Sequence, residues 1–240
     1  MFYHQTDNPN YYSYNPYHNS QYSPQSPPNI RDNIQNPSYS PPTYYQKHTH
    51  PIYNQNPYTH NTNWEEIRNI DVPYSDLFRK IADYAAINNF AGGFPTFRRD
   101  PARSIYEIIL INPQYGVKED IRNLPSPANF AQHIRNTDRN LKENPRYLSG
   151  FPNFHVSASG NLFGATRLFK NAGERRWVSD SELGIIGSET DENLMTRAQM
   201  YAERNGFAGG FPSFEHSTGN HEIILLNKDA ATKRIEYFPV

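Results

Sequence analysis

The 240-residue chain contains no cysteine, which excludes disulfide frameworks, thiolate metal sites and cysteine nucleophiles. It has no apolar run as long as a membrane-spanning helix needs. Its first residues, MFYHQTDNPN, have neither the basic nor the apolar region of a secretory signal. Positive charge is not in excess either, because 23 basic side chains face 24 acidic ones. We therefore expect no membrane span and no nucleic-acid partner, since binding to phosphates depends on a basic surface.

Charged and aliphatic residues are scarce in residues 1–63. This segment holds 11 of the 18 tyrosines and 10 of the 20 prolines, but only two basic and two acidic side chains. Because this segment has few aliphatic side chains to bury, it cannot offset the backbone entropy lost on folding, which costs roughly 1–2 kcal/mol per residue. We predict a disordered arm rich in Tyr, Pro, Asn and His, with an uncharged aromatic composition that favours self-association.

Two short patterns in this arm resemble binding motifs. His48-Thr49-His50, with His60 nearby, offers imidazoles to a metal ion but no carboxylate or thiolate to support them. Pro24 and Pro27 meet the minimal PxxP spacing, which a proline-rich segment produces by chance. We predict no metal site and no cofactor.

The rest of the chain repeats itself. FAGGFPTF at 90–97 and FAGGFPSF at 207–214 differ at one position, and SGFPNF at 149–154 is a weaker copy. Matching apolar runs follow the first and last copies, EIILIN at 107–112 and EIILLN at 222–227. A fixed period of this kind indicates a fold built from repeated supersecondary units.

The period predicts a repeat domain over residues 64–240. Its units lie at about 64–116, 117–173 and 174–232, with a closing strand at 233–240. Each unit reads as strand, helix, turn and strand, so the fold class is α+β with three repeats in one pseudo-threefold body. We expect the closing strand to pair with the opening strand near Trp64, which would remove two exposed sheet edges.

Local signals place the ends of these elements. The first helix is expected to end at Asn89 and the third at Asn205-Gly206, because both sites suit a left-handed residue. Ser126-Pro127 is expected to start the second helix, and Ser188 with Asp191 resembles a capping box for the third. Shorter strands are expected ahead of the helices, at 65–70, 117–124 and 176–183.

The repeated Gly-Phe-Pro-x-Phe segment is the strongest candidate site. In one interpretation the glycines make a helix-to-strand turn and the phenylalanines enter the core. In the other, the rings form an aromatic pocket for a sugar or a peptide, and then Phe94, Phe151 or Phe211 must be partly exposed. The candidate ligand-binding residues are Phe94, Phe97, Phe151, Phe154, Phe211 and Phe214. The candidate turn residues are Gly92, Gly93, Pro95, Gly150, Pro152, Gly209, Gly210 and Pro212.

Charged residues suggest a weaker, enzymatic hypothesis. Glu107 and Glu222 occupy equivalent places in their units, where Thr166 is expected in the middle unit. Two carboxylates would suit glycoside hydrolysis, in a pocket that draws residues such as His155 from different units. Repetition alone also explains the pair, so we predict no catalytic residue.

Polar residues beside the repeated segment have simpler interpretations. Arg98-Arg99, His155 and Glu215-His216 are interpreted as solvated loop residues. Arg175-Arg176 with Trp177 is interpreted as part of an edge strand, because nucleic-acid binding would need a wider basic stripe.

Two resemblances accompany these motifs. GFAGGFPSF at 206–214 and WVSDSELG at 177–184 resemble repeat units of uncharacterised bacterial proteins, a likeness that implies no activity. The arm is similar in composition to arms of bacterial spore-coat and other surface-assembly proteins.

The sequence favours a structural or interaction protein. In this interpretation the arm mediates assembly with itself or with other assembly proteins, and the repeat body serves as a scaffold. The alternative is a carbohydrate- or peptide-binding module that uses the phenylalanines. The sequence does not specify a compartment; a spore coat and the cytoplasm both suit it.

Overall fold

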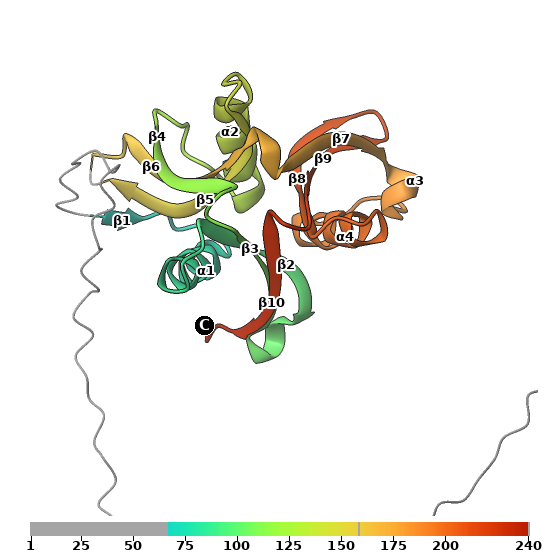
Figure 1. Cartoon of the computed structure of the whole chain (residues 1–240), viewed down its shortest axis with the longest axis horizontal. Helices are drawn as coiled ribbons and strands as arrows, with labels where there is room; N and C mark the ends of the chain where they lie inside the picture. Colours follow the sequence, from blue (N-terminus) through green and yellow to red (C-terminus); the bar gives the residue numbers. More distant parts are fainter. Residues whose placement is uncertain (1–66, 158, 240) are drawn as a thin grey trace, which may run out of the picture. The chain divides into compact units, whose positions relative to one another are not determined.

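Three small antiparallel sheets and four α-helices make up the part of the chain that can be described. The computed structural model describes residues 67–157 and 159–239, all of which belong to the unit Pro57–Val240. The fold is therefore mixed α+β, as predicted (Figure 1). The predicted disorder of residues 1–63, the histidines at 48, 50 and 60 and the PxxP pattern lie outside the described residues.

Each sheet draws its strands from separate parts of the chain. Sheet A has the order β1-β5-β6-β4, sheet B the order β10-β3-β2 and sheet C the order β7-β9-β8. The strands are β1 (Ile67–Asn69), β2 (Gly92–Asp100), β3 (Ile105–Ile111), β4 (Gly116–Arg122), β5 (Tyr147–Ser157), β6 (Leu162–Phe169), β7 (Gly173–Ser179), β8 (Gly209–Ser217), β9 (Asn220–Leu226) and β10 (Ala231–Tyr237). The helices are α1 (Ser75–Ile87), α2 (Phe130–Lys142), α3 (Asp180–Leu183) and α4 (Asp191–Arg204).

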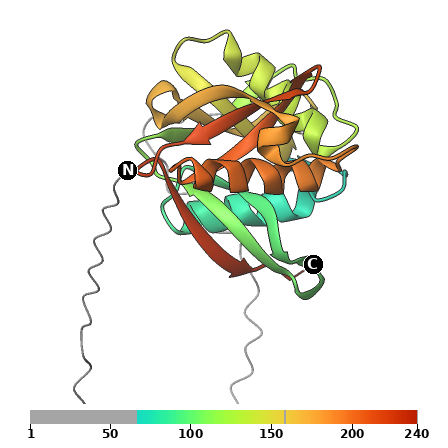
Figure 2. The same cartoon turned by 90° about the vertical axis from the view of Figure 1, so that its right-hand side faces the viewer.

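The closing strand pairs with a partner other than the predicted one. β10 runs antiparallel to β3 along its whole length, from Ala231 opposite Ile111 to Tyr237 opposite Ile105 (Figure 2). The opening strand β1 pairs instead with the end of β5. β3 is a buried apolar strand, so it needs a partner on both edges, which β2 and β10 supply. The predicted pairing near Trp64 is therefore wrong.

Helix ends follow the predicted signals at the C-termini better than at the N-termini. Asn89 and Gly206 adopt left-handed φ values of 61° and 82° after α1 and α4, as expected. At the start of α4 the cap is Thr190, whose side chain accepts from the Asn193 N–H. Helix α2 begins at Phe130, with Asn129 as its cap. The predicted starts at Ser188 and at Ser126-Pro127 are therefore wrong, because in each case a cap nearer the apolar stripe satisfies the first turn.

The predicted strand at 176–183 ends early. Residues after Ser179 form α3, and Ser179 makes a full capping box with Glu182. Its serine side chain accepts from the Glu182 N–H, while the glutamate side chain accepts from the Ser179 N–H. Local hydrogen bonding of this kind competes directly with strand pairing.

Candidate functional site

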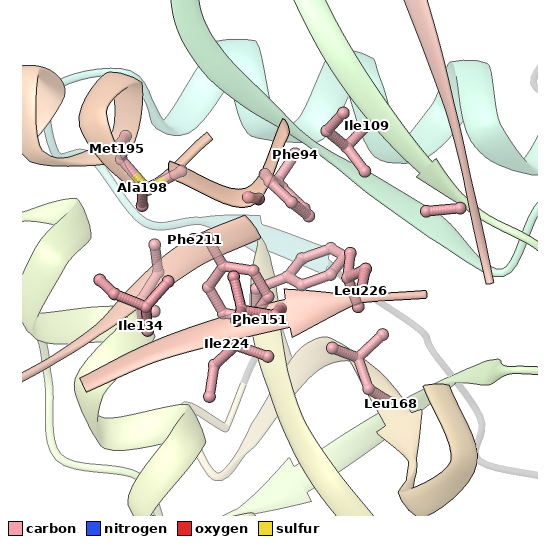
Figure 3. Packing of buried hydrophobic residues seen from close by; sticks show 14 of the residues in the cluster. Phe94, Ile109, Ile134, Phe151, Leu168, Met195, Ala198, Phe211, Ile224 and Leu226 are labelled. Carbon is pink, nitrogen blue, oxygen red and sulfur yellow. The ribbon is translucent and has the colours of Figure 1, made fainter. Parts of the chain in front are cut away.

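The first phenylalanines of the three repeated segments meet in the centre of the core. The ring centroid of Phe94 lies 5.1 Å from that of Phe151 and 4.9 Å from that of Phe211, and Phe151 lies 5.7 Å from Phe211. All three pairs pack edge-to-face, and no ring is more than 1% exposed (Figure 3). A binding pocket would require these phenylalanines to be partly exposed, so this prediction is wrong. One strand from each sheet delivers a ring to the same point, so the rings bury one another.

The glycines before these rings lie in strands, so the predicted turn is wrong. Gly93, Gly150 and Gly210 belong to β2, β5 and β8 and do not have left-handed φ values. Because these glycines have no side chain, neighbouring elements can pack closely against the strands. A Cβ on Gly150 would lie 2.4 Å from Leu141 Cδ1 and 2.6 Å from the Thr166 carbonyl oxygen. The missing side chain therefore lets helix α2 and strand β6 approach β5.

The second phenylalanines each occupy a β-bulge. Phe97, Phe154 and Phe214 have φ values of 56°, 62° and 61°, in the left-handed region that bulky residues rarely adopt. The strand register shifts at the same place in each sheet, just after the proline. The bulge turns these rings away from the pleat, toward the helices.

A side chain next to each bulge holds it in place. The hydroxyl of Thr96 accepts from the Arg98 N–H at 3.3 Å, and the hydroxyl of Ser213 accepts from the Glu215 N–H at 3.2 Å. In β5 the carbonyl of the Asn153 amide accepts from the His155 N–H at 3.1 Å. The side chain of the variable residue in the Gly-Phe-Pro-x-Phe segment therefore accepts a hydrogen bond from the backbone N–H two residues later.

The bulged phenylalanines belong to a second aromatic layer. Phe97 stacks on Phe130 of α2 with centroids 5.4 Å apart, and Phe214 lies 6.0 Å from the same ring. Phe154 packs 5.1 Å from Phe78 of α1. Phe154 and Phe214 are buried, whereas Phe97 is partly exposed. Five of the six candidate binding rings are thus core residues.

The two predicted glutamates are buried and bonded to their own bulges. The Thr96 hydroxyl donates to Glu107 Oε1 at 3.0 Å, and the Ser213 hydroxyl donates to Glu222 Oε2 at 2.9 Å. The matching position in sheet A is Gly164, one residue before the partner of the corner proline, Pro152. The prediction of Thr166 there is therefore wrong, because the register of β5 against β6 places Thr166 opposite Phe151.

Glu222 is part of a group that we call the Arg175 cluster, made of Asp138, Lys142, Arg175 and Glu222. The Arg175 guanidinium lies 2.6 Å from Asp138 Oδ1 and 3.0 Å from Glu222 Oε2. Lys142 Nζ lies 3.1 Å from Glu222 Oε1. The Ser149 hydroxyl also donates to Asp138 at 2.6 Å. Buried carboxylates are thus matched by cations, and the cluster joins sheet C to helix α2.

Glu107 belongs to a comparable Arg98 cluster, made of Arg98, Glu107, Glu203 and Lys233. Arg98 Nη1 lies 3.4 Å from Glu107 Oε1 and 2.7 Å from Glu203 Oε2. Lys233 Nζ lies 2.6 Å from Glu203 Oε1. Burial raises the pKa of Glu203, but hydrogen bonds from Lys233, Arg98 and Gln199 outweigh it and lower that pKa to about 2. This cluster joins sheet B to helix α4.

Sheet A has a different polar set at the corresponding place. Burial lowers the pKa of Lys118 and of His155. It raises the pKa of Asp120 to about 6, against the opposing charges of Lys118 and Arg167. Desolvation therefore outweighs the opposing charges at Asp120, whereas hydrogen bonds and charge together outweigh it at Glu203.

The structure does not bring the residues of the enzymatic hypothesis together in one site. Glu107 and Glu222 lie in different sheets, and among residues 67–157 and 159–239 no side chain is bonded to both. In the same ranges no group of three or more His, Asp or Glu side chains could hold a metal ion, and no helix is long and apolar enough to cross a membrane. The arrangement can hold charge and join sheets.

The solvated interpretation of the residues next to the bulges holds for Arg99 and His216, which are exposed, but not for the other three. Arg98 bonds to Glu203, and Glu215 forms an ion pair with Arg139 of α2. His155 is half-buried in strand β5. Arg175 and Trp177 do lie on an edge strand, β7, as predicted.

Sequence reasoning missed the centre of the Arg175 cluster. Asp138 is fully buried on the apolar face of α2, four residues after Ile134 and three before Leu141. An acidic residue in the middle of an apolar stripe is the signal that was available, because such a residue must find a cation.

The chain matches no protein-family model, no curated protein and no solved structure with which it was compared.

Proposed function

We propose that this chain is an assembly protein, with a three-unit scaffold body and an N-terminal arm (residues 1–63) that drives self-association. The units of the scaffold are 64–116, 117–173 and 174–232. The last strand, β10, belongs to the first unit, where it occupies the place that β4 and β7 have in sheets A and C.

Matching contacts of β10 and β7 support this assignment. Arg234 of β10 donates to the hydroxyl of Tyr84 at 3.0 Å, and Arg176 of β7 donates to the hydroxyl of Tyr201 at 3.2 Å. These tyrosines occupy the same place in the repeated sequence. Arg234 lies opposite Ile108 and Arg176 opposite Ile223, the partners of the two corner prolines.

Contacts between successive sheets support a closed, pseudo-threefold body. Helix α1 packs on β2 and β5, α2 on β5 and β8, and α4 on β8 and β2. Gly92 of sheet B lies against Thr166 of sheet A, and Gly209 of sheet C lies against Ile109 of sheet B. Thr166 and Ile109 are themselves matching register positions, opposite Phe151 and Phe94. The same contact thus passes from one unit to the next.

The observation that carries the assembly function is the contrast between arm and body. The body uses its phenylalanines and most of its buried charges internally, in the central rings and the two clusters. The arm concentrates 11 tyrosines and 10 prolines with almost no charge. Tyrosine offers a large apolar ring with a hydrogen-bonding group, which suits contacts between chains. This composition is of the kind found in spore-coat and surface assemblies.

Light scattering over a rising concentration series tests the proposal. Full-length protein should form species that grow with concentration, whereas residues 64–240 should stay at one size. A full-length variant with its 11 arm tyrosines replaced by serine keeps the chain length and should also stay small. Equal behaviour of the three proteins would exclude assembly through the arm.

A further inference from the structure

The three sheets differ in how their edges are covered. Strand β1 adds to sheet A by pairing with the end of β5, with Asn69 opposite His155 and Ile67 opposite Ser157. β2 and β8 are the corresponding strands of sheets B and C. Within residues 67–157 and 159–239, no strand pairs with their outer edges. Edge strands present unpaired backbone groups that can bind another strand.

The end of β8 has the geometry to receive a strand. Ser217 lies opposite Asn220 across a two-residue turn, so these two form the hydrogen-bonded pair of the hairpin. The next pair, His216 and His221, is then the non-hydrogen-bonded one, which directs the backbone groups of His216 away from β9. His216 and Ser217 are both exposed.

The pairing of β1 in sheet A shows how such an edge is used. Val156 has the same place in its hairpin that His216 has in β8, and it pairs with Arg68. One difference leaves fewer free backbone groups for strand pairing on β8 than on β5. There the Phe214 carbonyl accepts from Arg135 Nε at 2.7 Å, whereas the Phe154 carbonyl accepts from the Ile70 N–H at 3.4 Å. His216 is therefore the main pairing residue.

The arm contains one segment that resembles β1. Residues 30–34 read Ile-Arg-Asp-Asn-Ile, and residues 67–70 read Ile-Arg-Asn-Ile. The segment 29–36 lies between Pro28 and Pro37 and contains no proline, so every residue in it has an N–H to donate. It also holds two of the three isoleucines in the arm.

We propose that residues 29–36 of a second copy pair with the outer edge of β8, as β1 pairs with β5. The inference rests on the proposed self-association and adds a strand-pairing contact to those of the arm tyrosines, so that assembly needs both. Each copy offers one such segment and one such edge, so the contact is head-to-tail and extends from copy to copy unless the rotation between copies closes a ring.

Charge and backbone geometry favour β8 over β2. The edge of β2 carries the exposed Arg99, which would repel the incoming Arg31, whereas on β8 the charge of Glu215 is balanced by Arg139 of α2. Arg99 also has a φ of 99°, which interrupts a regular ladder on β2.

Disulfide trapping tests the contact directly, because the chain has no cysteine of its own. A full-length Arg31→Cys chain is mixed with a full-length His216→Cys chain under mild oxidation. Opposed residues of paired strands come close enough for a disulfide. The docked segment should raise the yield of the mixed dimer about tenfold over the control pairs, through its higher effective concentration.

Two control pairs isolate the site. Ile52→Cys with His216→Cys keeps the edge but moves the arm thiol outside the segment. Arg31→Cys with Arg99→Cys keeps the segment but moves the edge to β2. Equal yields in all three mixtures would overturn the proposal. One chain carrying both Arg31→Cys and His216→Cys should form cross-links between chains, and a dominant intrachain disulfide would also overturn it.

A backbone substitution gives a second readout. His216→Pro removes an N–H that points away from β9, so the hairpin should persist while association of the full-length protein is lost. Association that persists in a folded His216→Pro protein would overturn the docking site. Full-length protein that associates without the specific cross-link would leave the proposed function intact and reject this contact. Absence of association would reject both.

Discussion

Sheets A and B build the same bulge with different residues. In sheet B, Thr96 has a short side chain and its neighbour Glu107 a long one, and the two are hydrogen-bonded. In sheet A, the side chain of Asn153 reaches further than that of Thr96, and the neighbouring position is Gly164, which has none. A Cβ at Gly164 would lie 2.2 Å from Asn153 Oδ1, so the amide fills the space left by the missing side chain. The comparison teaches that the hydrogen bond to the bulge is kept while the side chains that fill the adjacent space change.

The helices extend this comparison. The buried face of α1 places Leu77 and Ile81 where α2 places His133 and Thr137. Both ring nitrogens of His133 and the hydroxyl of Thr137 are buried without a hydrogen-bond partner. Each such group costs roughly 1–3 kcal/mol. Sheet A is therefore covered by a helix face that contributes less to stability than that of sheet B.

The central rings are where the sheets do not differ, and there we expect the largest effect. Phe151→Ala should lower the free energy of unfolding by about 3–5 kcal/mol, because it empties a fully buried site between two other rings. Phe94→Ala should cost about as much. Chemical denaturation measures both, with Tyr237→Ala as an exposed control. A loss below about 1 kcal/mol at either position would show that the three rings do not form one core.

The next effect separates buried from exposed charge on one helix. Asp138→Asn removes a fully buried carboxylate from Arg175 and should cost about 3 kcal/mol, because the guanidinium loses its closest counter-charge. Arg139→Gln, at the adjacent residue, breaks a largely exposed pair with Glu215 and should cost less than about 1 kcal/mol. Equal losses in denaturation experiments would contradict the assignment of the Arg175 cluster as a buried network.

The sequence predicted those parts of the fold that depend on local chemistry. The apolar runs at 107–112 and 222–227 became β3 and β9, and Asn89 and Gly206 ended their helices. Both signals act within a few residues, through periodicity and backbone conformation.

What failed depends on contacts between distant residues. The pairing of β10 with β3 joins residues more than 100 apart, so no local signal specifies it. The left-handed Phe97 opposes the intrinsic preference of phenylalanine and is held by the Thr96 side chain and by packing. Burial of the phenylalanines was one of the two interpretations of the repeated segment, and the sequence alone left the choice open because burial follows from three strands converging on one point.

Acid pH should sharpen the contrast between the two helix faces. Burial lowers the pKa of His133 to about 4, from an ordinary 6.5, so the folded protein takes up this proton only at lower pH than the unfolded chain. The stability of the folded state therefore falls as pH drops from 6.5 to 4, by a total of about 3 kcal/mol from this group. His133→Leu should remove that loss.

The measurement is the difference in unfolding free energy between the parent and His133→Leu at several pH values. A difference is needed because Asp120 also makes stability depend on pH. Its pKa is raised to about 6, so its contribution to the stability of the folded state falls as pH rises, whereas that of His133 increases. His216→Leu, at an exposed histidine, is the matched control. A difference that stays constant between pH 7 and pH 4 would show that His133 is not desolvated in the folded protein.

The smallest effect tests how Asn153 and Gly164 share the space beside the bulge in sheet A. Gly164→Ala alone should cost about 1–3 kcal/mol, because the new methyl group meets the Asn153 amide. Asn153→Ser keeps an acceptor for the His155 N–H and clears the space, so the double variant should be more stable than the two separate losses predict. Thr96→Asn is the reverse control: Glu107 already occupies that space in sheet B, so the asparagine tolerated beside Gly164 should destabilise the protein there. Additive losses in the double-mutant cycle would mean that the two sheets reach the same backbone independently of this pair.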